Sequence, residues 1–326
     1  MSGNKKKSGF VAIISAIIAV AALIIIMSVV GSPTGNTPHL AEGTQTATTQ
    51  AGDNKDSKEA SESEKADKKS DETKESDKDD EKETTEASSS SKSKMGGIHP
   101  DFLDDAIKTE KNAKKKVYLT FDDGPSKYTD EVLDVLDKYD VKATFFNVSA
   151  GNSKYLDSEK KTYEKGHTIA IHTKSHEYDE VYGSFENWKA DVLAQQESME
   201  ENTGAITKFY RFPGGSSNTM GVKYGTDIHD CVDWLEKNGY EYYDWNVSND
   251  DSEGVAYSPS ELANNVLDYI GDGDEYMVLM HDTGAKENTL KSLPIIIEEL
   301  KDRGFTLCQI TENTSPYHHR IYGDSE

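Results

Sequence analysis

Apolar and polar residues alternate in two regular patterns from about residue 117 to about residue 310. Short apolar runs, rich in β-branched and aromatic side chains, are typical of strands buried on both faces. Longer segments between them carry apolar side chains three and four residues apart, which indicates amphipathic helices. The predicted strands are 117–121, 143–148, 168–172, 208–212, 240–247, 276–280 and 305–310. The predicted helices are 129–139, 158–165, 185–202, 227–237, 259–270 and 290–303.

This order of elements predicts the fold class. Strands that alternate with helices form parallel sheets, because each helix carries the chain back to the start of the next strand. About seven such repeats predict an α/β fold in which the sheet closes into a barrel. Active sites in these barrels lie at the carboxyl ends of the strands. The polar residues that follow each strand are therefore the first candidates for chemistry.

The N-terminal part of the chain has a different pattern. Residues 10–30 form an uncharged apolar run that follows three lysines at positions 5–7. As a helix this run would rise roughly 31 Å, which is enough to cross the hydrocarbon core of a bilayer. We therefore expect residues 1–31 to form a cytoplasmic stub and a single-pass transmembrane anchor, with the rest outside the cell membrane. Cleavage near Gly31, as in a secretory signal peptide, is the alternative and would give a secreted protein.

Residues 32–96 consist mainly of Ser, Thr, Glu, Asp and Lys, with almost no large apolar side chain. Such a segment cannot bury enough surface to offset the entropy of ordering it. We predict a disordered linker that holds a folded domain, residues 97–326, away from the membrane. The low hydrophobic content of the whole chain, 34%, agrees with a chain that is only partly folded.

Charge and cysteine content narrow the possible partners. The formal net charge of −24 argues against nucleic acid and anionic lipid surfaces as partners, because both select basic patches. It does not argue against a neutral glycan. The two cysteines, Cys231 and Cys308, are expected to be buried thiols, and one disulfide bridge is the alternative in an extracellular domain. Their number and spacing exclude a cysteine metal motif.

Polar side chains follow five of the predicted strands. The residues concerned are Asp122-Asp123, His172 with His176, Arg211-Phe-Pro213-Gly-Gly215, Ser248-Asn-Asp250-Asp251 and His281-Asp282. His172 and His176 are four residues apart, so a turn after the strand would bring the two imidazoles together. With Asp123 they would offer two nitrogens and one carboxylate, and would leave open positions for water, as catalytic metal sites do.

Asp122 and Asp123 are neighbours at the end of one strand. Side chains alternate along a strand, so the two carboxylates can take different roles, one binding a cation and the other moving protons. His167 precedes its strand and is expected to be a loop residue at the opposite end of the barrel.

Four segments occur in the order and roughly the spacing of one known family. They are Thr120-Phe-Asp-Asp-Gly124, His172-Thr-Lys-Ser-His176, Arg211-x-Pro213-x-Gly215 and Leu279-x-His281. With these segments, the stretch 117–310 resembles the polysaccharide deacetylases, also called the NodB homology family or carbohydrate esterase family 4. The resemblance implies a distorted (β/α)7 barrel and metal-dependent removal of N- or O-acetyl groups from a glycan.

The resemblance also implies a role for each matching residue. Asp122 would be the general base and His281 the general acid, and Arg211 would orient and tune Asp122. Asp123, His172 and His176 would bind a divalent metal ion. The ligand types suit Zn²⁺ first, with Co²⁺ or Ni²⁺ as alternatives. The expected substrate-binding residues are Leu279, at the acetyl methyl group, and Pro213, Gly214, Gly215 and Asp251, along the groove.

The chain departs from the family pattern in two places. The fourth motif is usually Asp-x-x-Asp-Trp, but residues 248–252 lack the first Asp and the Trp, and Trp245 is expected to be a core strand residue. Gly214 stands where the family often has an aromatic residue, which is expected to open one wall of the groove. Either Asp250 or Asp251 is expected to hold His281 in its protonated form.

These observations lead to the hypothesis of an anchored, outward-facing deacetylase that acts on a cell-wall or envelope glycan. The amino sugars of peptidoglycan are the leading substrates, because the linker would place the domain in or near the wall. Chitin oligosaccharides and O-acetylated polysaccharides of the xylan type are alternatives. A non-catalytic glycan-binding module is the contrasting hypothesis, and the presence of all five candidate acid, base and metal-binding residues argues against it.

Overall fold

The computed structural model describes residues 95–324, and these contain a parallel β-sheet of eight strands. The strands are β1 Lys116–Asp122, β2 Thr144–Val148, β3 Thr168–Thr173, β4 Phe209–Tyr210, β5 Glu241–Tyr242, β6 Val247–Ser248, β7 Glu275–His281 and β8 Thr306–Cys308. Their order across the sheet is β5-β4-β3-β2-β1-β7-β6, and β8 pairs with the first half of β1. The predicted parallel α/β architecture is therefore confirmed.

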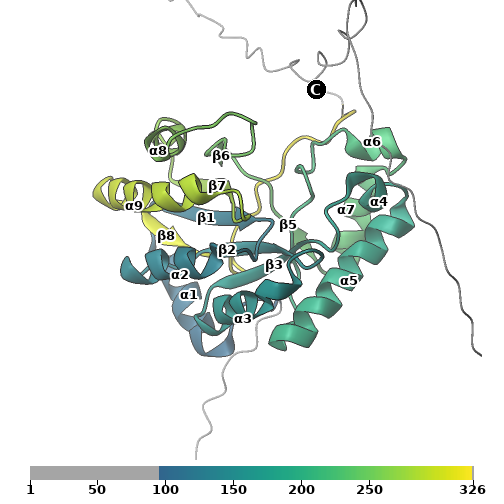
Figure 1. Ribbon diagram of the computed structural model, residues 1–326, viewed down its shortest axis with the longest axis horizontal. Helices are drawn as coiled ribbons and strands as arrows, with labels where there is room; N and C mark the ends of the chain where they lie inside the picture. Colours follow the sequence, from purple (N-terminus) through teal and green to yellow (C-terminus); the bar gives the residue numbers. More distant parts are fainter. Residues whose placement is uncertain (1–94, 325–326) are drawn as a thin grey trace, which may run out of the picture. The chain divides into compact units, whose positions relative to one another are not determined.

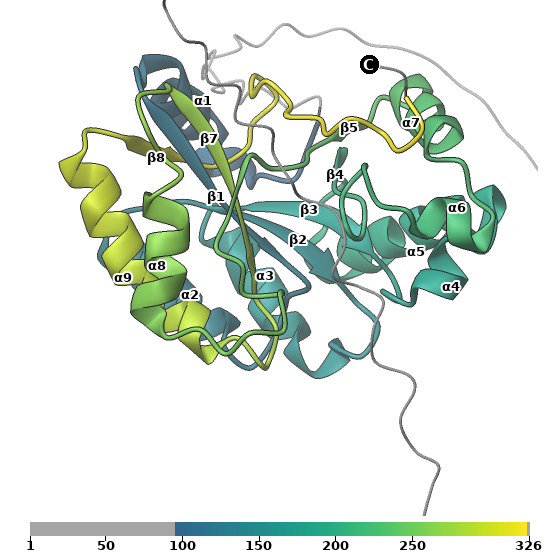
Figure 2. The ribbon, with the colours of Figure 1, turned by 90° about the horizontal axis from the view of Figure 1, so that it is seen from above.

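Helices pack on the outer face of this curved sheet. They are α1 Pro100–Asn112, α2 Thr129–Lys138, α3 Leu156–Glu164, α4 Tyr178–Val181, α5 Phe185–Thr203, α6 Met220–Tyr224, α7 Ile228–Lys237, α8 Pro259–Leu267 and α9 Glu287–Asp302, with a short 3₁₀ turn, η1, at Ser153–Tyr155. Figures 1 and 2 show α2, α8 and α9 on the side of β1 and β7, and α5, α6 and α7 on the side of β3 and β4. All six helices predicted from the pattern are present, with ends shifted by a few residues.

The sheet does not close into the predicted seven-stranded barrel. The expected fifth strand, 240–247, is split into β5, which pairs with β4, and β6, which pairs with β7 at the other edge. Between them the chain crosses the gap. Tyr243 N still bonds to Tyr210 O (2.9 Å), and Asn246 N bonds to Met277 O (3.1 Å). The carbonyls of Tyr243 and Asp244 bond instead to the Arg211 side chain. The result is a curled, open half-barrel.

The two faces of each central strand have different neighbours. In β1, Val117, Leu119 and Phe121 pack into an apolar cluster with α2, α8 and α9. Ile169 and Ile171 of β3 pack with α5 and α7 around the buried Trp188 in the same way. The alternate positions point to the inner face, where a third cluster contains Tyr118, Phe146, Ala170 and Phe209. Because the period along a strand is two residues, the inner face also receives the residues that end each strand.

Helix α1 was not predicted, and it closes the end of the sheet where the strands begin. It contacts β8 and carries a buried carboxylate, Glu110, which is 3% exposed. Glu110 accepts hydrogen bonds from the hydroxyls of Tyr118 (2.7 Å), Thr314 (2.6 Å) and Thr311. One side chain therefore ties α1 to β1 and to the segment after β8.

The predictions for residues 1–94, namely the anchor and nearly all of the linker, lie outside the described residues. Among the helices within residues 95–324, none combines the length and the apolar composition needed to cross a bilayer. At Met95, two residues before the predicted domain boundary at 97, the backbone carbonyl accepts a hydrogen bond from Lys208 N (2.7 Å), just before β4. Cys231 and Cys308 are both buried free thiols, as expected.

We predict that Glu110→Ala lowers the free energy of unfolding by about 3 kcal/mol, because three buried hydroxyls lose their acceptor. Urea denaturation of the purified protein measures the change. Lys111→Ala, on the exposed side of the same helix, is the matched control and should shift stability by less than about 0.5 kcal/mol. Equal stability of the Glu110→Ala and Lys111→Ala proteins would contradict this role for Glu110.

Candidate functional site

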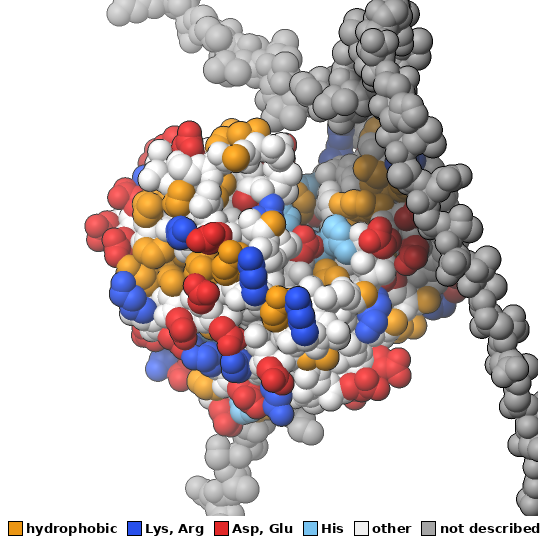
Figure 3. All heavy atoms as spheres, viewed as in Figure 1, with side chains coloured by type: hydrophobic (Ala, Val, Ile, Leu, Met, Phe, Trp, Pro, Cys, Tyr) orange, Lys and Arg blue, Asp and Glu red, His pale blue; other side chains and the backbone are white. Residues whose placement is uncertain are grey.

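The carboxyl ends of β1, β3, β4 and β7 bring the predicted polar residues together on the inner face of the sheet. Asp122 lies opposite His281 in the β1–β7 register, and Ile171 lies opposite Tyr210 just before His172 and Arg211. These four residues occupy the inward-facing positions of their strands, in step with Tyr118 and Ala170. Figure 3 shows histidine side chains reaching the surface near the middle of one face, beside acidic side chains.

Asp123, His172 and His176 form a cluster with the geometry of a metal site. One ligand atom from each lies within 4.8 Å of the others. Asp123 Oδ1 is 3.2 Å from His176 Nε2 and 3.5 Å from His172 Nε2. Asp123, which directly follows β1, and His176 both have positive φ, 70° and 58°. At Asp123 the backbone departs from the extended conformation of a strand, so strand alternation does not set the direction of its carboxylate.

The donor set fits a divalent metal ion. Asp123 Oδ1 is buried and has no hydrogen-bond partner among residues 95–324. A buried carboxylate oxygen without a partner is costly, and a cation between it and the two imidazoles would remove that cost. Two nitrogens and one carboxylate oxygen suit Zn²⁺ and its neighbours by ligand type.

His172 is held in the form that a metal ligand requires. Its Nδ1 lies 2.9 Å from the carbonyl oxygen of Arg211, and a carbonyl can only accept, so the proton is on Nδ1. The lone pair of Nε2 is then directed toward Asp123. Burial lowers the pKa of His172 to about 3, so the ring stays neutral at ordinary pH.

The segment between the two histidines, residues 173–175, is fixed from α5 by Asp191. Its carboxylate accepts hydrogen bonds from Thr173 Oγ1 (2.6 Å), Lys174 N (2.8 Å) and Ser175 N (3.1 Å). No motif in the sequence marks Asp191. The available signal was its position one turn after Trp188, which places a carboxylate on the inward-facing side of the helix.

Asp122 forms a buried ion pair with Arg211. The two side chains are 3% and 0% exposed, and Arg211 Nη1 lies 2.7 Å from Asp122 Oδ1. The other oxygen, Oδ2, is 3.9 Å from His172 Nε2 and so lies beside the metal-binding cluster. Burial raises the pKa of Asp122, and the positive charge of Arg211 offsets part of this rise.

His281 is paired with Asp251, which answers the question that the sequence left open. Asp251 Oδ1 is 2.6 Å from His281 Nδ1, and Oδ2 accepts from His281 N (3.0 Å) and Thr289 Oγ1 (2.7 Å). Burial alone would lower the pKa of His281, but the hydrogen bond and the charge of Asp251 outweigh it and raise the pKa. Asp250, at φ 61°, lines a separate small cavity with Trp245 and Tyr317.

Two expectations about the groove need correction. Asp251 was expected along the substrate groove, but its side chain is 3% exposed and lies behind His281. Trp245 was expected to be a core strand residue, but it lies between β5 and β6, is half-buried, and packs against Gly215. A Cβ added to Gly215 would be 2.9 Å from the Trp245 ring, so this contact requires glycine.

The other expected groove residues differ in exposure. Leu279 is 6% exposed on the inner side of β7. Pro213 is buried, and its carbonyl accepts from Tyr182 Oη (2.9 Å), whereas Gly214 is exposed. His167 precedes β3 as predicted, but it is fully buried, with Nδ1 accepting from Ala143 N (3.1 Å).

Asp282, beside His281, explains why glycine follows the two carboxylates of β1. The buried Asp282 accepts from Ser126 Oγ (3.2 Å) and Thr129 Oγ1, and so fixes the loop after β1 to β7. A Cβ on Gly124 would lie 2.8 Å from Asp282 Oδ2. Burial raises the pKa of Asp282 to about 7.

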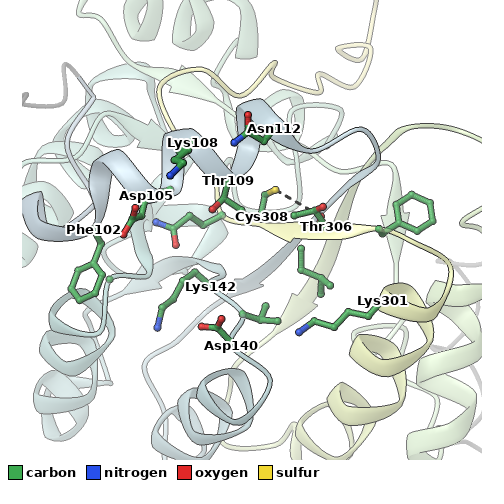
Figure 4. A pocket seen from close by; sticks show the side chains of 16 residues that line it. Phe102, Asp105, Lys108, Thr109, Asn112, Asp140, Lys142, Lys301, Thr306 and Cys308 are labelled. Atoms are coloured by element: carbon green, nitrogen blue, oxygen red, sulfur yellow. Dashed lines mark hydrogen bonds between the residues drawn. The ribbon is translucent and has the colours of Figure 1, made fainter.

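A large cavity, of about 780 Å³, opens at the other end of the sheet. It lies between α1 and the beginning of β8, and Figure 4 shows Lys108, Lys142 and Lys301 around it together with Asp105 and Asp140. None of its lining residues belongs to the cluster at the carboxyl ends of the strands. We therefore locate the functional site by its chemistry and not by cavity size.

At one edge of the curled parallel sheet, neighbouring strands bring together a His–His–Asp cluster, a buried carboxylate and a carboxylate-bound imidazole, and this arrangement is that of a hydrolase that can hold a metal ion. The family model for polysaccharide deacetylase matches residues 109–228. YheN of Bacillus subtilis, which is named after the same family, is 30% identical over 232 residues, covering 69% of this chain and 78% of YheN. The chain belongs to the polysaccharide deacetylase family.

Two further proteins are similar over nearly two thirds of this chain. The catalytic domain of peptidoglycan N-acetylglucosamine deacetylase from Eubacterium rectale has 36% identity and a TM-score of 0.62, covering 65% of this chain and 95% of that domain. A bifunctional xylanase/deacetylase from Pseudobutyrivibrio xylanivorans is 32% identical over 205 residues, which cover 63% of this chain and 31% of that protein.

We predict that Asp191→Ala weakens Zn²⁺ binding about 10-fold or more, because the loop with His172 and His176 loses three hydrogen bonds. Competition with a chromogenic chelator measures the affinity. Glu197→Ala, at an exposed position of α5, is the control and should bind Zn²⁺ as the wild type does. Unchanged affinity in Asp191→Ala would show that the loop holds its geometry without this carboxylate.

Proposed function

We propose that the protein is a metal-dependent hydrolase that removes N-acetyl groups from a cell-wall or envelope glycan, with peptidoglycan amino sugars as the leading substrate. The observation that carries this proposal is that a buried carboxylate, a possible metal-binding cluster and a carboxylate-bound imidazole lie in one site. Asp122 Oδ2 lies on one side of the His–His–Asp cluster, and His281 approaches from β7 with its Nδ1 already bonded. An amide hydrolase needs a base for water and an acid for the amine, and these two groups fit those tasks.

Each proposed role follows from the chemistry of amide cleavage. A divalent metal ion held by Asp123, His172 and His176 would polarise the acetyl carbonyl and acidify a water molecule. Asp122 accepts the proton from the attacking water, and its raised pKa strengthens it as a base. His281 gives a proton to the leaving amine from Nε2, because its Nδ1 is engaged by Asp251. Arg211 holds Asp122 Oδ1, so that Oδ2 is left for the proton.

Substrate and location are supported by separate observations. The similarity to the catalytic domain from Eubacterium rectale favours peptidoglycan N-acetylglucosamine. The apolar run at 10–30 and the polar segment after it favour a single-pass anchor and an extracellular catalytic domain from about residue 97, or a secreted protein if the run is cleaved. Zn²⁺ is the proposed metal, with Co²⁺ and Ni²⁺ as alternatives.

The second candidate is an O-acetyl esterase acting on xylan-type polysaccharides, and the relative from Pseudobutyrivibrio xylanivorans favours it. The deciding experiment uses the full chain in detergent, stripped of metal and reloaded with Zn²⁺, Co²⁺ or Ni²⁺. Acetate release is measured from peptidoglycan, chitooligosaccharides and acetylated xylan. Release from xylan alone would establish the esterase. Glycan binding without acetate release under any metal would establish a binding module.

We predict that Asp123→Ala loses both Zn²⁺ binding and activity, whereas Asp122→Asn keeps Zn²⁺ affinity within about threefold and loses activity by about 100-fold or more. The first variant removes a ligand, and the second removes only the base. Because Asp122→Asn also removes the counter-charge of the buried Arg211, the melting temperature is measured on the same preparation. An Asp122→Asn protein that hydrolyses at the wild-type rate would refute the base assignment.

The pH profile tests the His281–Asp251 pair. His281 acts as an acid only when protonated, so activity falls as pH rises through its pKa. Asp251 raises this pKa, and Asp251→Asn should therefore move the alkaline limb of kcat against pH to lower pH. Asp250→Asn is the adjacent control and should leave the limb in place. An alkaline limb that stays fixed in Asp251→Asn would assign that limb to another group.

A further inference from the structure

Tyr178 and Gly214 face each other beside the metal-binding cluster. The ring centroid of Tyr178, the first residue of α4, is 5.4 Å from that of His176, with the rings edge to face. A Cβ built on Gly214 would lie 3.3 Å from the Tyr178 hydroxyl. Gly214 is exposed and Tyr178 is half-buried, so both reach the surface of the site. The wall that was expected to be open at Gly214 therefore has an aromatic side chain from another element.

The position of the Tyr178 ring is fixed from behind. It stacks on Tyr182, with centroids 6.2 Å apart and ring planes 14° from parallel. Tyr182 is fully buried, donates to Pro213 O (2.9 Å) and accepts from Asn218 Nδ2 (3.2 Å). Tyr178 therefore contacts two other rings, those of Tyr182 and His176. Because the side chain is only half-buried, part of it remains accessible beside the metal-binding cluster.

Within residues 95–324 the hydroxyl of Tyr178 has no hydrogen-bond partner. The hydroxyl of Tyr182, the residue that directly follows α4, has two partners. A tyrosine that only supported His176 would need no hydroxyl at this point. A rigid aromatic face with an unused hydroxyl at its edge is instead suited to a sugar ring, whose C–H groups pack on aromatic faces and whose oxygens accept hydrogen bonds.

We propose that Tyr178 contacts the sugar that carries the acetyl group, by packing its ring against the pyranose and donating its hydroxyl to a sugar oxygen, and that it thereby determines the preference for glycans. The inference rests on the proposed deacetylase function. Gly214 serves the same contact, because a Cβ there would lie 3.3 Å from the Tyr178 hydroxyl and would push it out of its present position by a few tenths of an ångström. Tyr178 would act on binding, and Asp122 and His281 would retain the proton transfers.

The first experiment compares a chitooligosaccharide with 4-nitrophenyl acetate, an activated acetyl ester that has no sugar. In the full-length Zn²⁺ protein, Tyr178→Phe should raise KM for the oligosaccharide about 3- to 10-fold, the effect of one hydrogen bond, with kcat nearly unchanged. Tyr178→Ala should raise it about 10-fold or more. Both variants should hydrolyse the ester within about twofold of the wild type.

The matched control is Tyr322→Ala, which removes an exposed tyrosine outside the site and should leave both substrates unaffected. Zn²⁺ affinity is measured for every variant. A loss of Zn²⁺ affinity, or an equal loss on both substrates, would mean that Tyr178 supports His176 and would overturn the proposal. Wild-type KM for the oligosaccharide in Tyr178→Ala would also overturn it. An inactive wild type would instead refute the proposed function, so the two failures are distinguishable.

A double-mutant cycle tests the role of Gly214. Gly214→Ala should raise KM for the oligosaccharide in the wild-type background, because its methyl group displaces the Tyr178 hydroxyl. In the Tyr178→Ala background the same change should have a much smaller effect. Melting temperatures control for strain, since Gly214 has φ 77°. Equal effects in the two backgrounds would separate Gly214 from Tyr178 and overturn this part of the proposal.

Discussion

The buried guanidinium group of Arg211 is the constraint on which the site and the fold both depend. A cation with no exposed surface must find acceptors within the protein. Arg211 donates hydrogen bonds to Asp122 and Thr120 on β1. It also donates to the carbonyls of Tyr243 and Asp244, where the chain crosses the gap in the sheet. The guanidinium group also packs over the ring of Phe146, with Arg211 Cζ 4.0 Å from the ring centroid. One residue therefore orients the proposed base and replaces the strand pairing that a closed barrel would have there.

A second regularity is that two of the three histidines of the site are held by a hydrogen bond at Nδ1. His172 donates Nδ1 to a carbonyl, and His281 donates Nδ1 to the Asp251 carboxylate. The carbonyl is neutral and the carboxylate is negatively charged, so the two imidazoles differ in protonation. Because His172 is buried and bonded to a neutral carbonyl, it has no proton on Nε2, as a metal ligand requires. The Asp251 carboxylate instead stabilises the protonated form of His281, as a general acid requires.

The strands, six of the helices and the meeting of Asp122, His172, Arg211 and His281 could be predicted because they depend on local periodicity. Residues that end parallel strands at inward positions share one edge, whatever the details of the loops. Other features depend on contacts between distant segments. At the split of 240–247 the Arg211 side chain bonds to the carbonyls of the crossing chain, and in the loop after β6 it is Asp251, not Asp250, that bonds to His281. Asp191 and Tyr178 contact the site from helices that no motif marks.

The gap between β5 and β6 has a consequence for solubility. A closed barrel has no free strand edges, whereas an open sheet presents backbone groups that can pair with another molecule. Here both edge strands are only two residues long, at Glu241–Tyr242 and Val247–Ser248. The His318 ring also stacks on Tyr242 at 3.7 Å and bonds to its carbonyl oxygen (3.0 Å), so the segment after β8 covers one edge, as Figure 2 shows near β5. Short edges and a covering segment limit edge-to-edge aggregation without requiring the sheet to close.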